Sequence, residues 1–161
     1  RYVIDLGGRD LVIRDCVIRG TLVLRNAGPG TRIEDSVAWE PVVPGDPIVI
    51  VEGTLTVAGD GTPVQEQTIG VDLDGDGARG STMPAVLDGL IYTTGRLTVQ
   101  GRPTFGGSLV TLNGVHFDAA EAHFAGGRGD PDRIPAGFAV DDVVTVVRPG
   151  TLSTLGFGGG N

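Results

Sequence analysis

The sequence contains no lysine, only one cysteine and few aromatic residues, and each shortage excludes a class of protein. All twelve basic residues are arginine, and twenty acidic residues leave a net charge of −8. Nucleic acids and anionic membranes bind positively charged surfaces, so neither is expected as a partner. The lone Cys16 cannot form an internal disulfide, and a chain of 161 residues can bury a continuous core without one.

Long apolar runs and helical stripes are also missing. No run approaches the roughly 18 apolar residues that a membrane helix requires, so no membrane segment is expected in this chain. Instead, 28 glycines and ten prolines separate short runs of Val, Ile and Leu. Many tight turns between short apolar runs are typical of an all-β protein.

A five-residue pattern recurs along the chain and predicts its architecture. Isoleucine, any residue, aspartate, a small residue and valine occupy Ile13–Val17 and return 20 residues later at Ile33–Val37. Looser forms follow at Val86–Leu90 and Thr111–Val115. Aspartate and asparagine tolerate left-handed backbone, so we interpret them as corners at which the chain turns sharply. Self-similarity of this kind indicates a solenoid whose turns stack on one another.

We therefore predict an all-β fold, a parallel β-helix (β-solenoid) that forms a single domain over residues 1–161. Short parallel strands suit this arrangement, because each strand pairs with an equivalent strand above and below it. The strands expected before residue 58 are Val3–Leu6, Leu11–Ile13, Cys16–Ile18, Leu22–Leu24, Arg32–Ile33, Val37–Trp39, Ile48–Val51 and Leu55–Val57.

The remaining segments are expected to interrupt or close the coil. Residues 58–84 show little apolar periodicity and should form an inserted loop, and the proline-rich Pro41–Pro47 should form a smaller excursion. A capping segment is expected over residues 119–155, with a helical turn at Ala119–Phe124 and a strand at Phe138–Val147. Residues 156–161 form a Gly-rich tail.

The sharpest chemical motif lies within the inserted loop. Asp72, Asp74 and Asp76 occupy alternate positions and are followed by glycine. Carboxylates in this order can converge on one hard cation, as in the first half of an EF-hand calcium loop. The second half differs, because Met83 stands where the bidentate glutamate would be. We predict a calcium site at the three aspartates, completed by Asp88 or a carbonyl; the alternative is a polar hairpin tip.

No catalytic residues are predicted, although one pair of carboxylates is an alternative for that role. Asp15 and Asp35 would stack about 4.8 Å apart at equivalent corners of neighbouring turns. With Arg14 beside them, they could form a carboxylate cluster that cleaves a polysaccharide. A structural role at the corners is the simpler interpretation. No Ser/His/Asp order or phosphate-binding loop occurs in the sequence.

Two family resemblances add to this interpretation. The segment LVIRDCVIRG resembles the rungs of right-handed parallel β-helices of the pectate-lyase-like superfamily, which commonly place Asn or Asp at a corner. Most members with known activity act on polysaccharides, and many others are binding or structural modules. The C-terminal half resembles the β-rich region of bacterial prepilin-type, type IV pilus-associated surface proteins, through Leu87–Gly101, Gly106–Val110, Pro135–Phe138 and Val147–Gly150.

The second resemblance implies export to the cell surface, a prepilin helix before Arg1, and no catalytic residues. We therefore expect a fragment of a longer bacterial protein. Its expected function is that of a non-catalytic, extracytoplasmic structural or adhesive module. The expected partners are other surface or pilus proteins, or extracellular polysaccharide. The alternative is a carbohydrate-binding or polysaccharide-cleaving β-helix.

Overall fold

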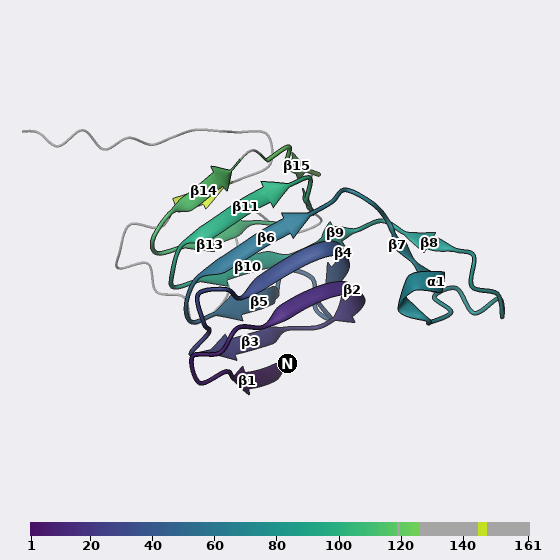
Figure 1. Ribbon diagram of the computed structural model, residues 1–161, viewed down its shortest axis with the longest axis horizontal. Coiled ribbons are helices and arrows are strands. Elements are labelled where there is room, and N and C mark those ends of the chain that lie inside the picture. The colour runs from purple at the N-terminus through teal and green to yellow at the C-terminus, as the bar shows by residue number, and fades with distance from the viewer. Residues whose placement is uncertain (119, 126–144, 148–161) are drawn as a thin grey trace, which may run out of the picture.

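The computed structural model describes residues 1–118, 120–125 and 145–147, which fold mainly as β-strands (Figure 1). Among these residues the helical structure is one short element, α1 (Glu66–Ile69). The strands are β1 (Tyr2–Asp5), β2 (Val12–Arg19), β3 (Leu22–Arg25), β4 (Arg32–Glu40), β5 (Pro47–Val51), β6 (Leu55–Gly59), β7 (Val64–Gln65), β8 (Thr82–Met83), β9 (Val86–Leu87), β10 (Leu90–Thr93), β11 (Leu97–Gly101), β12 (Thr104–Phe105), β13 (Leu109–Thr111), β14 (Val115–Asp118), β15 (His123–Phe124) and β16 (Thr145–Val147).

Two parallel sheets form the body of the protein, one behind the other in Figure 1. The first has the order β1-β3-β5-β10-β13, with β16 added antiparallel at its edge. The second has the order β14-β11-β6-β4-β9-β12-β15, and β2 pairs with β4 beside this path. Successive passes of the chain thus lie side by side in both sheets. The predicted all-β fold with parallel sheets is confirmed.

Equivalent positions of successive passes pair in register along the second sheet. Val12 pairs with Arg32, Arg32 with Thr56, Thr56 with Thr98, and Thr98 with His116. The first interval matches the 20 residues that the repeated motif predicts. The following intervals are 24, 42 and 18 residues, so two passes carry additional chain.

Two excursions account for the longer intervals. The shorter one, residues 41–46, exposes Val42 at the surface. The larger one leaves the second sheet after β6 and returns at β9, and it projects from the body in Figure 1. We call this segment, residues 60–85, the inserted lobe. It contains β7, α1 and β8, and its two strands pair antiparallel.

Asp15 and Asp35 form corners, as the motif predicts. Their φ angles of 46° and 59° lie in the left-handed region, which aspartate tolerates better than most residues. The pairing of β2 with β4 shifts register between Arg14 and Cys16, and it continues beyond the corner. Two pairs of expected short strands are therefore joined into the longer β2 and β4.

Asp88 and Asn113 do not stand at the same corner as Asp35, so this part of the predicted repeat is wrong. The Asp88 amide donates to the carbonyl of Trp39, which places Asp88 further along the pass than Asp35. The Asn113 side chain donates to the carbonyl of Thr94, at a third corner. Every corner of the coil favours a residue that turns the chain. The motif therefore indicates that a corner is present, but it does not distinguish one corner of a pass from another.

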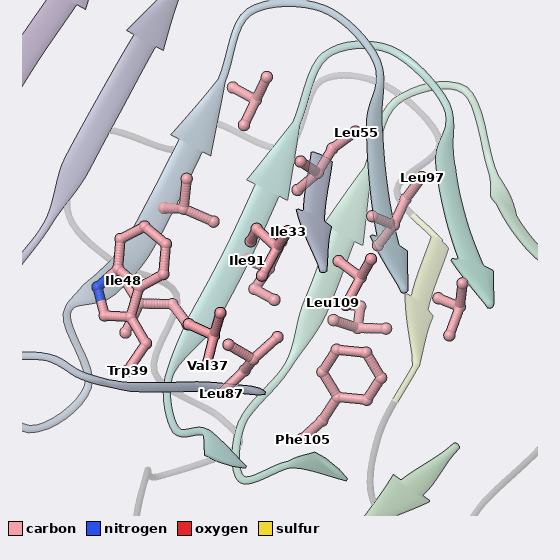
Figure 2. Packing of buried hydrophobic residues seen from close by; sticks show 14 of the residues in the cluster. Ile33, Val37, Trp39, Ile48, Leu55, Leu87, Ile91, Leu97, Phe105 and Leu109 are labelled. Carbon is pink, nitrogen blue, oxygen red and sulfur yellow. The ribbon is translucent and has the colours of Figure 1, made fainter. Parts of the chain in front are cut away.

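The core lies between the sheets and consists of stacked rows of apolar side chains (Figure 2). One row joins Ile33, Val57 and Val99 through the registers of β4, β6 and β11. Along β11, buried residues alternate with partly exposed ones, because successive side chains of a strand point to opposite faces. Each row buries apolar surface that a single short strand would leave exposed.

Polar groups inside the body have hydrogen-bond partners. The indole of Trp39 donates to the carbonyl of Gly20 at 2.9 Å, and the buried Thr111 hydroxyl donates to the carbonyl of Gly95 at 2.6 Å. Within the described residues, no buried side-chain nitrogen or oxygen lacks a partner. These bonds offset the cost of removing polar groups from water.

The C-terminal part of the described chain differs in part from the prediction. The helical turn predicted at Ala119–Phe124 is wrong, because His123 and Phe124 form β15 beside β12. The ring of Phe124 stacks on that of Phe105, with centroids 5.2 Å apart, and this contact favours an extended backbone. Of the predicted strand Phe138–Val147, Thr145–Val147 form β16, and the remainder lies outside the described residues. Over the described part of the chain, no helix is long and apolar enough to cross a membrane.

Replacement of Leu97 by alanine tests the stacked core. Leu97 is fully buried between Leu55 and Val115, and its truncation should lower the free energy of unfolding by about 2–5 kcal/mol. Urea denaturation followed by circular dichroism measures the change. The neighbouring Thr98→Ala variant is the control, because the Thr98 side chain points away from the core. Equal losses in the two variants would contradict this account of the packing.

Candidate functional site

The first candidate site is the acidic loop of the inserted lobe, and a buried carboxylate organises it. Glu66 opens α1 and is 0% exposed. One of its oxygens accepts a hydrogen bond from the Leu73 amide at 2.6 Å, and the other accepts one from the Ser81 amide at 2.8 Å. This carboxylate therefore holds the two ends of the loop against the helix. Gly70 ends the helix in left-handed backbone with φ 72°.

Asp72 shapes the tip of the loop. Its two oxygens accept hydrogen bonds from the amides of Gly75 and Gly77, at 2.7 and 2.9 Å. Both glycines have positive φ, 77° and 81°, a conformation that other residues rarely adopt. The chain therefore bends sharply at the tip of the loop.

Asp74 and Asp76 accept further hydrogen bonds from the loop. Asp74 accepts one from the Ser81 hydroxyl at 2.6 Å and one from the Asp76 amide at 3.2 Å. Asp76 accepts one from the Ala78 amide at 2.7 Å. The Ser81 hydroxyl, followed by the Asp76 amide, lowers the pKa of Asp74, because hydrogen bonds to a carboxylate favour its ionised form.

The carboxylates that approach one another differ from those that the sequence motif indicates. Carboxylate oxygens of Glu66, Asp72 and Asp74 all lie within 4.8 Å of one another, whereas Asp76 is not part of this group. Asp88 lies at a corner of the body, where Gly106 packs against it. Glu66 was missed because nothing in its local sequence shows that a loop beginning six residues later folds back onto it.

The second candidate site is a cavity of about 240 Å³ between the body and the inserted lobe. Asp15 and Asp35 line it from the corners of two successive passes, and Asp60 lines it from the next pass. Asp35 pairs in register with Gly59, so Asp60 follows directly after the position equivalent to the Asp35 corner. The structure thus brings Asp15 and Asp35 to one place, as predicted, and adds Asp60.

Polar groups of the lobe connect Asp60 to the body. The Asp60 carboxylate accepts hydrogen bonds from the amide and hydroxyl of Thr62, at 2.8 and 2.7 Å. The Thr62 hydroxyl also lies 2.7 Å from that of Ser36, which donates to the Thr62 carbonyl at 3.1 Å. Ser36 is the small residue that follows the Asp35 corner. The lobe is therefore seated on the same corner that the repeated motif marks.

Negative charge accumulates at this corner and acts on Asp35. Desolvation, followed by the charges of Asp15, Glu34 and Asp60, raises the pKa of Asp35, and Arg14 opposes this shift. Desolvation and neighbouring negative charges both disfavour the ionised form of the Asp35 carboxylate. The charge of Arg14 also acts on Glu34, because the Arg14 guanidinium lies 3.9 Å from the Glu34 carboxylate.

The outward face of the second sheet carries acidic residues that have partners on the same face. Glu34 lies 2.6 Å from Arg32 and 3.9 Å from Arg14. Further along the face, Asp118 accepts a hydrogen bond from the Gln100 amide at 3.0 Å. These acids do not converge on a shared point. The face differs in this respect from the cavity at the Asp35 corner.

Replacement of Ser81 by alanine tests the hydrogen bonding of the acidic loop. Loss of the hydroxyl removes the largest contribution that lowers the pKa of Asp74, so this pKa should rise toward its ordinary value of 3.8. In the wild-type protein the hydrogen bonds of Asp74 stabilise the loop above its ordinary pKa and are lost as the pH falls through the lowered pKa. A carboxyl-carbon NMR titration measures the shift. Ser108→Ala, outside the lobe, should leave the pKa unchanged, and an unchanged value in Ser81→Ala would contradict the assignment.

Within the part of the chain that the structure describes, the acidic loop and the corner cavity are thus two places where polar side chains gather. The cavity joins residues far apart in the sequence, whereas the acidic loop and its helix lie within residues 66–81, and each site includes an acid, Asp60 or Glu66, that the motifs did not identify. Comparison of the chain with protein-family models, curated proteins and solved structures finds no match.

Proposed function

We propose that the chain is a right-handed parallel β-helix that serves as a non-catalytic structural or adhesive module, extracytoplasmic and part of a bacterial surface or pilus-associated protein. The observation that carries this proposal is the registered pairing of Val12, Arg32, Thr56, Thr98 and His116 on successive passes. Such pairing satisfies the backbone of each inner strand from both sides and makes a stiff support. A stiff support with a polar outer face suits contact with other surface proteins or with extracellular polysaccharide.

The paired acids of the outer face support a non-catalytic role. Glycoside cleavage requires two carboxyl groups that flank one bond. On this face, Glu34 is held by two arginines, and Asp118 is bonded to Gln100. Neither acid is free to act with a second carboxylate on a bound chain.

Exposure on intact cells tests the surface assignment. We expect protease added to intact cells of the source bacterium to remove the protein from an immunoblot made with an antibody against this chain. A cytoplasmic protein serves as the control and should survive the same treatment. Complete protection of the chain on intact cells, with cleavage only after lysis, would contradict a surface role.

We also propose that the acidic loop binds one calcium ion, with ligands drawn from the predicted Asp72, Asp74 and Asp76 and from the neighbouring Glu66. The approach of Glu66, Asp72 and Asp74 to within 4.8 Å supports the proposal, because calcium prefers several carboxylate and carbonyl oxygens around one point. Bound calcium would offset the repulsion between these acids and stabilise the lobe.

Calcium should therefore raise the melting temperature, and a chelator should reverse the effect, because an ion that binds the folded state stabilises it. Asp74→Asn should abolish the shift while retaining a polar partner for Ser81. Asp118→Asn removes the same charge from the outer face and should respond as the wild type does. A melting temperature that is insensitive to calcium in the wild type would exclude the site.

A carbohydrate-binding or polysaccharide-cleaving β-helix is the second candidate function, and the corner cavity favours it. Asp15, Asp35 and Asp60 line one cavity together with hydroxyl groups, and a carboxyl group with a raised pKa, as at Asp35, is suited to donate a proton. Incubation with acidic and neutral polysaccharides distinguishes the two functions. We expect no release of reducing or unsaturated ends; release that is lost in Asp35→Asn would establish the second function instead.

A further inference from the structure

The two sheets end together at an edge formed by β1 and β2, and we call this edge the open end (Figure 1). β1 lies beyond β3 at the end of the first sheet, and β2 pairs with β4. Within the described residues, no strand pairs with the other side of β1 or β2. The open end therefore presents unpaired backbone groups, which form a ready template for a further strand.

The hydrogen bonds of β1 show which of its residues face outward from the sheet edge. The amides of Tyr2 and Leu6 donate to the carbonyls of Thr21 and Arg25 in the following part of the chain. Because the backbone groups of alternate strand residues point in opposite directions, those of Val3 point away from β3. A strand that adds to the open end would therefore form hydrogen bonds with Val3.

The apolar rows of the core reach the surface at the open end. Tyr2 pairs with Leu22 and Ile4 with Leu24, yet Tyr2 is 74% and Ile4 42% exposed, whereas Leu24 is 1% exposed. Among the described residues, half of the eight exposed large apolar side chains belong to β1 and β2, namely Tyr2, Val3, Ile4 and Val12. Exposed apolar surface that is concentrated in one place is typical of a protein–protein contact.

The charges along β2 and the residues before it complement those of a second, antiparallel copy. An antiparallel alignment that places Arg14 opposite Asp15 of the second copy also places Arg19 opposite Asp10. Opposite charges at directly opposed positions stabilise an antiparallel pair of strands. The Arg14 and Arg19 side chains are 63% and 71% exposed, although each lies beside a glutamate of β4, so both remain accessible to a partner. By symmetry, each of these charge pairs forms twice.

The same alignment also matches apolar positions with apolar positions. It places Ile13 opposite Cys16 of the second copy, and the partners of both residues on β4 are buried. On β1, a two-fold axis at Val3 places Tyr2 opposite Ile4, the two side chains at which the exposed rows end. The charged pairs thus lie at the outer positions, and the apolar pairs continue the core.

We propose that the open end is a dimer interface, at which a second copy of this chain pairs antiparallel through β1 and β2 about a two-fold axis. A two-fold axis brings one patch against its own equivalent, so each copy covers the strand edges and apolar rows of the other. The interface is closed by this symmetry, and association therefore stops at two copies. The inference goes beyond the proposed function and does not depend on it.

Sedimentation equilibrium of the whole chain over a range of concentrations tests the dimer. We expect the mass of two chains at high concentration. Val3→Asp should weaken association at least tenfold, because it brings two carboxylates together at the axis. Val42→Asp is the matched control, since Val42 is an exposed valine in the excursion at residues 41–46, and it should associate as the wild type does. A wild-type monomer at every concentration, or equal association of the two variants, would overturn the proposal.

Crosslinking tests the symmetry of the interface and does not require a disruptive variant. Cys16→Ala removes the natural thiol, and Val3→Cys in this background should give a crosslinked dimer with a short bismaleimide, because Val3 faces its own equivalent across the axis. Thr98→Cys in the same background lies on the outer face of the second sheet and should remain uncrosslinked. Equal crosslinking of the two variants, or assembly that continues beyond two copies as the concentration rises, would exclude the two-fold dimer.

Discussion

Parallel pairing between successive passes of the chain is the constraint on which the rest of this structure depends. Strands of two to nine residues form the two main sheets, and pieces this short bury little surface by themselves. Pairing in register places Ile33 between Ile13 and Val57, so that each apolar side chain is covered by its equivalents. Backbone groups of the inner strands are satisfied by the same arrangement.

The pairing also determines where extra chain can be accommodated. An insertion within a strand would shift the register and turn core side chains toward solvent, whereas an insertion at a corner leaves both neighbouring ladders intact. The inserted lobe leaves after Gly59, the register partner of Asp35, and β9 and β11 resume pairing beyond it. The acidic and hydroxyl side chains gather at such a corner because the interior rows are filled with aliphatic and aromatic groups.

The two acidic groups illustrate how the same residue type is tuned in opposite directions. In the lobe, a hydroxyl and an amide donate to Asp74, and these bonds lower its pKa. At the Asp35 corner, partial burial and neighbouring acids raise the pKa of Asp35. The two pKa shifts differ in sign because the surroundings differ. The loop directs hydrogen-bond donors toward its own carboxylates, whereas the corner places carboxylates of separate passes close together.

The local sequence by itself determined the corners and the period of the first pass. Asp15 and Asp35 are followed by small residues and repeat at 20 residues, and both adopt the left-handed backbone that such residues tolerate. Aspartate and glycine identify a turn through their own conformational preferences, so this information is local. The same preferences serve every corner equally, which is why Asp88 and Asn113 were assigned to the wrong one.

Only the tertiary structure decided which acids meet. Glu66 reaches Asp72 and Asp74 because α1 and the following loop fold back on each other, and Asp60 joins Asp15 and Asp35 because three passes bring their corners together. Phe124 likewise extends as a strand because it finds Phe105 on the neighbouring pass. The meetings of Asp60 with Asp15 and Asp35 and of Phe124 with Phe105 depend on register between passes, a property of the paired strands that no single segment contains.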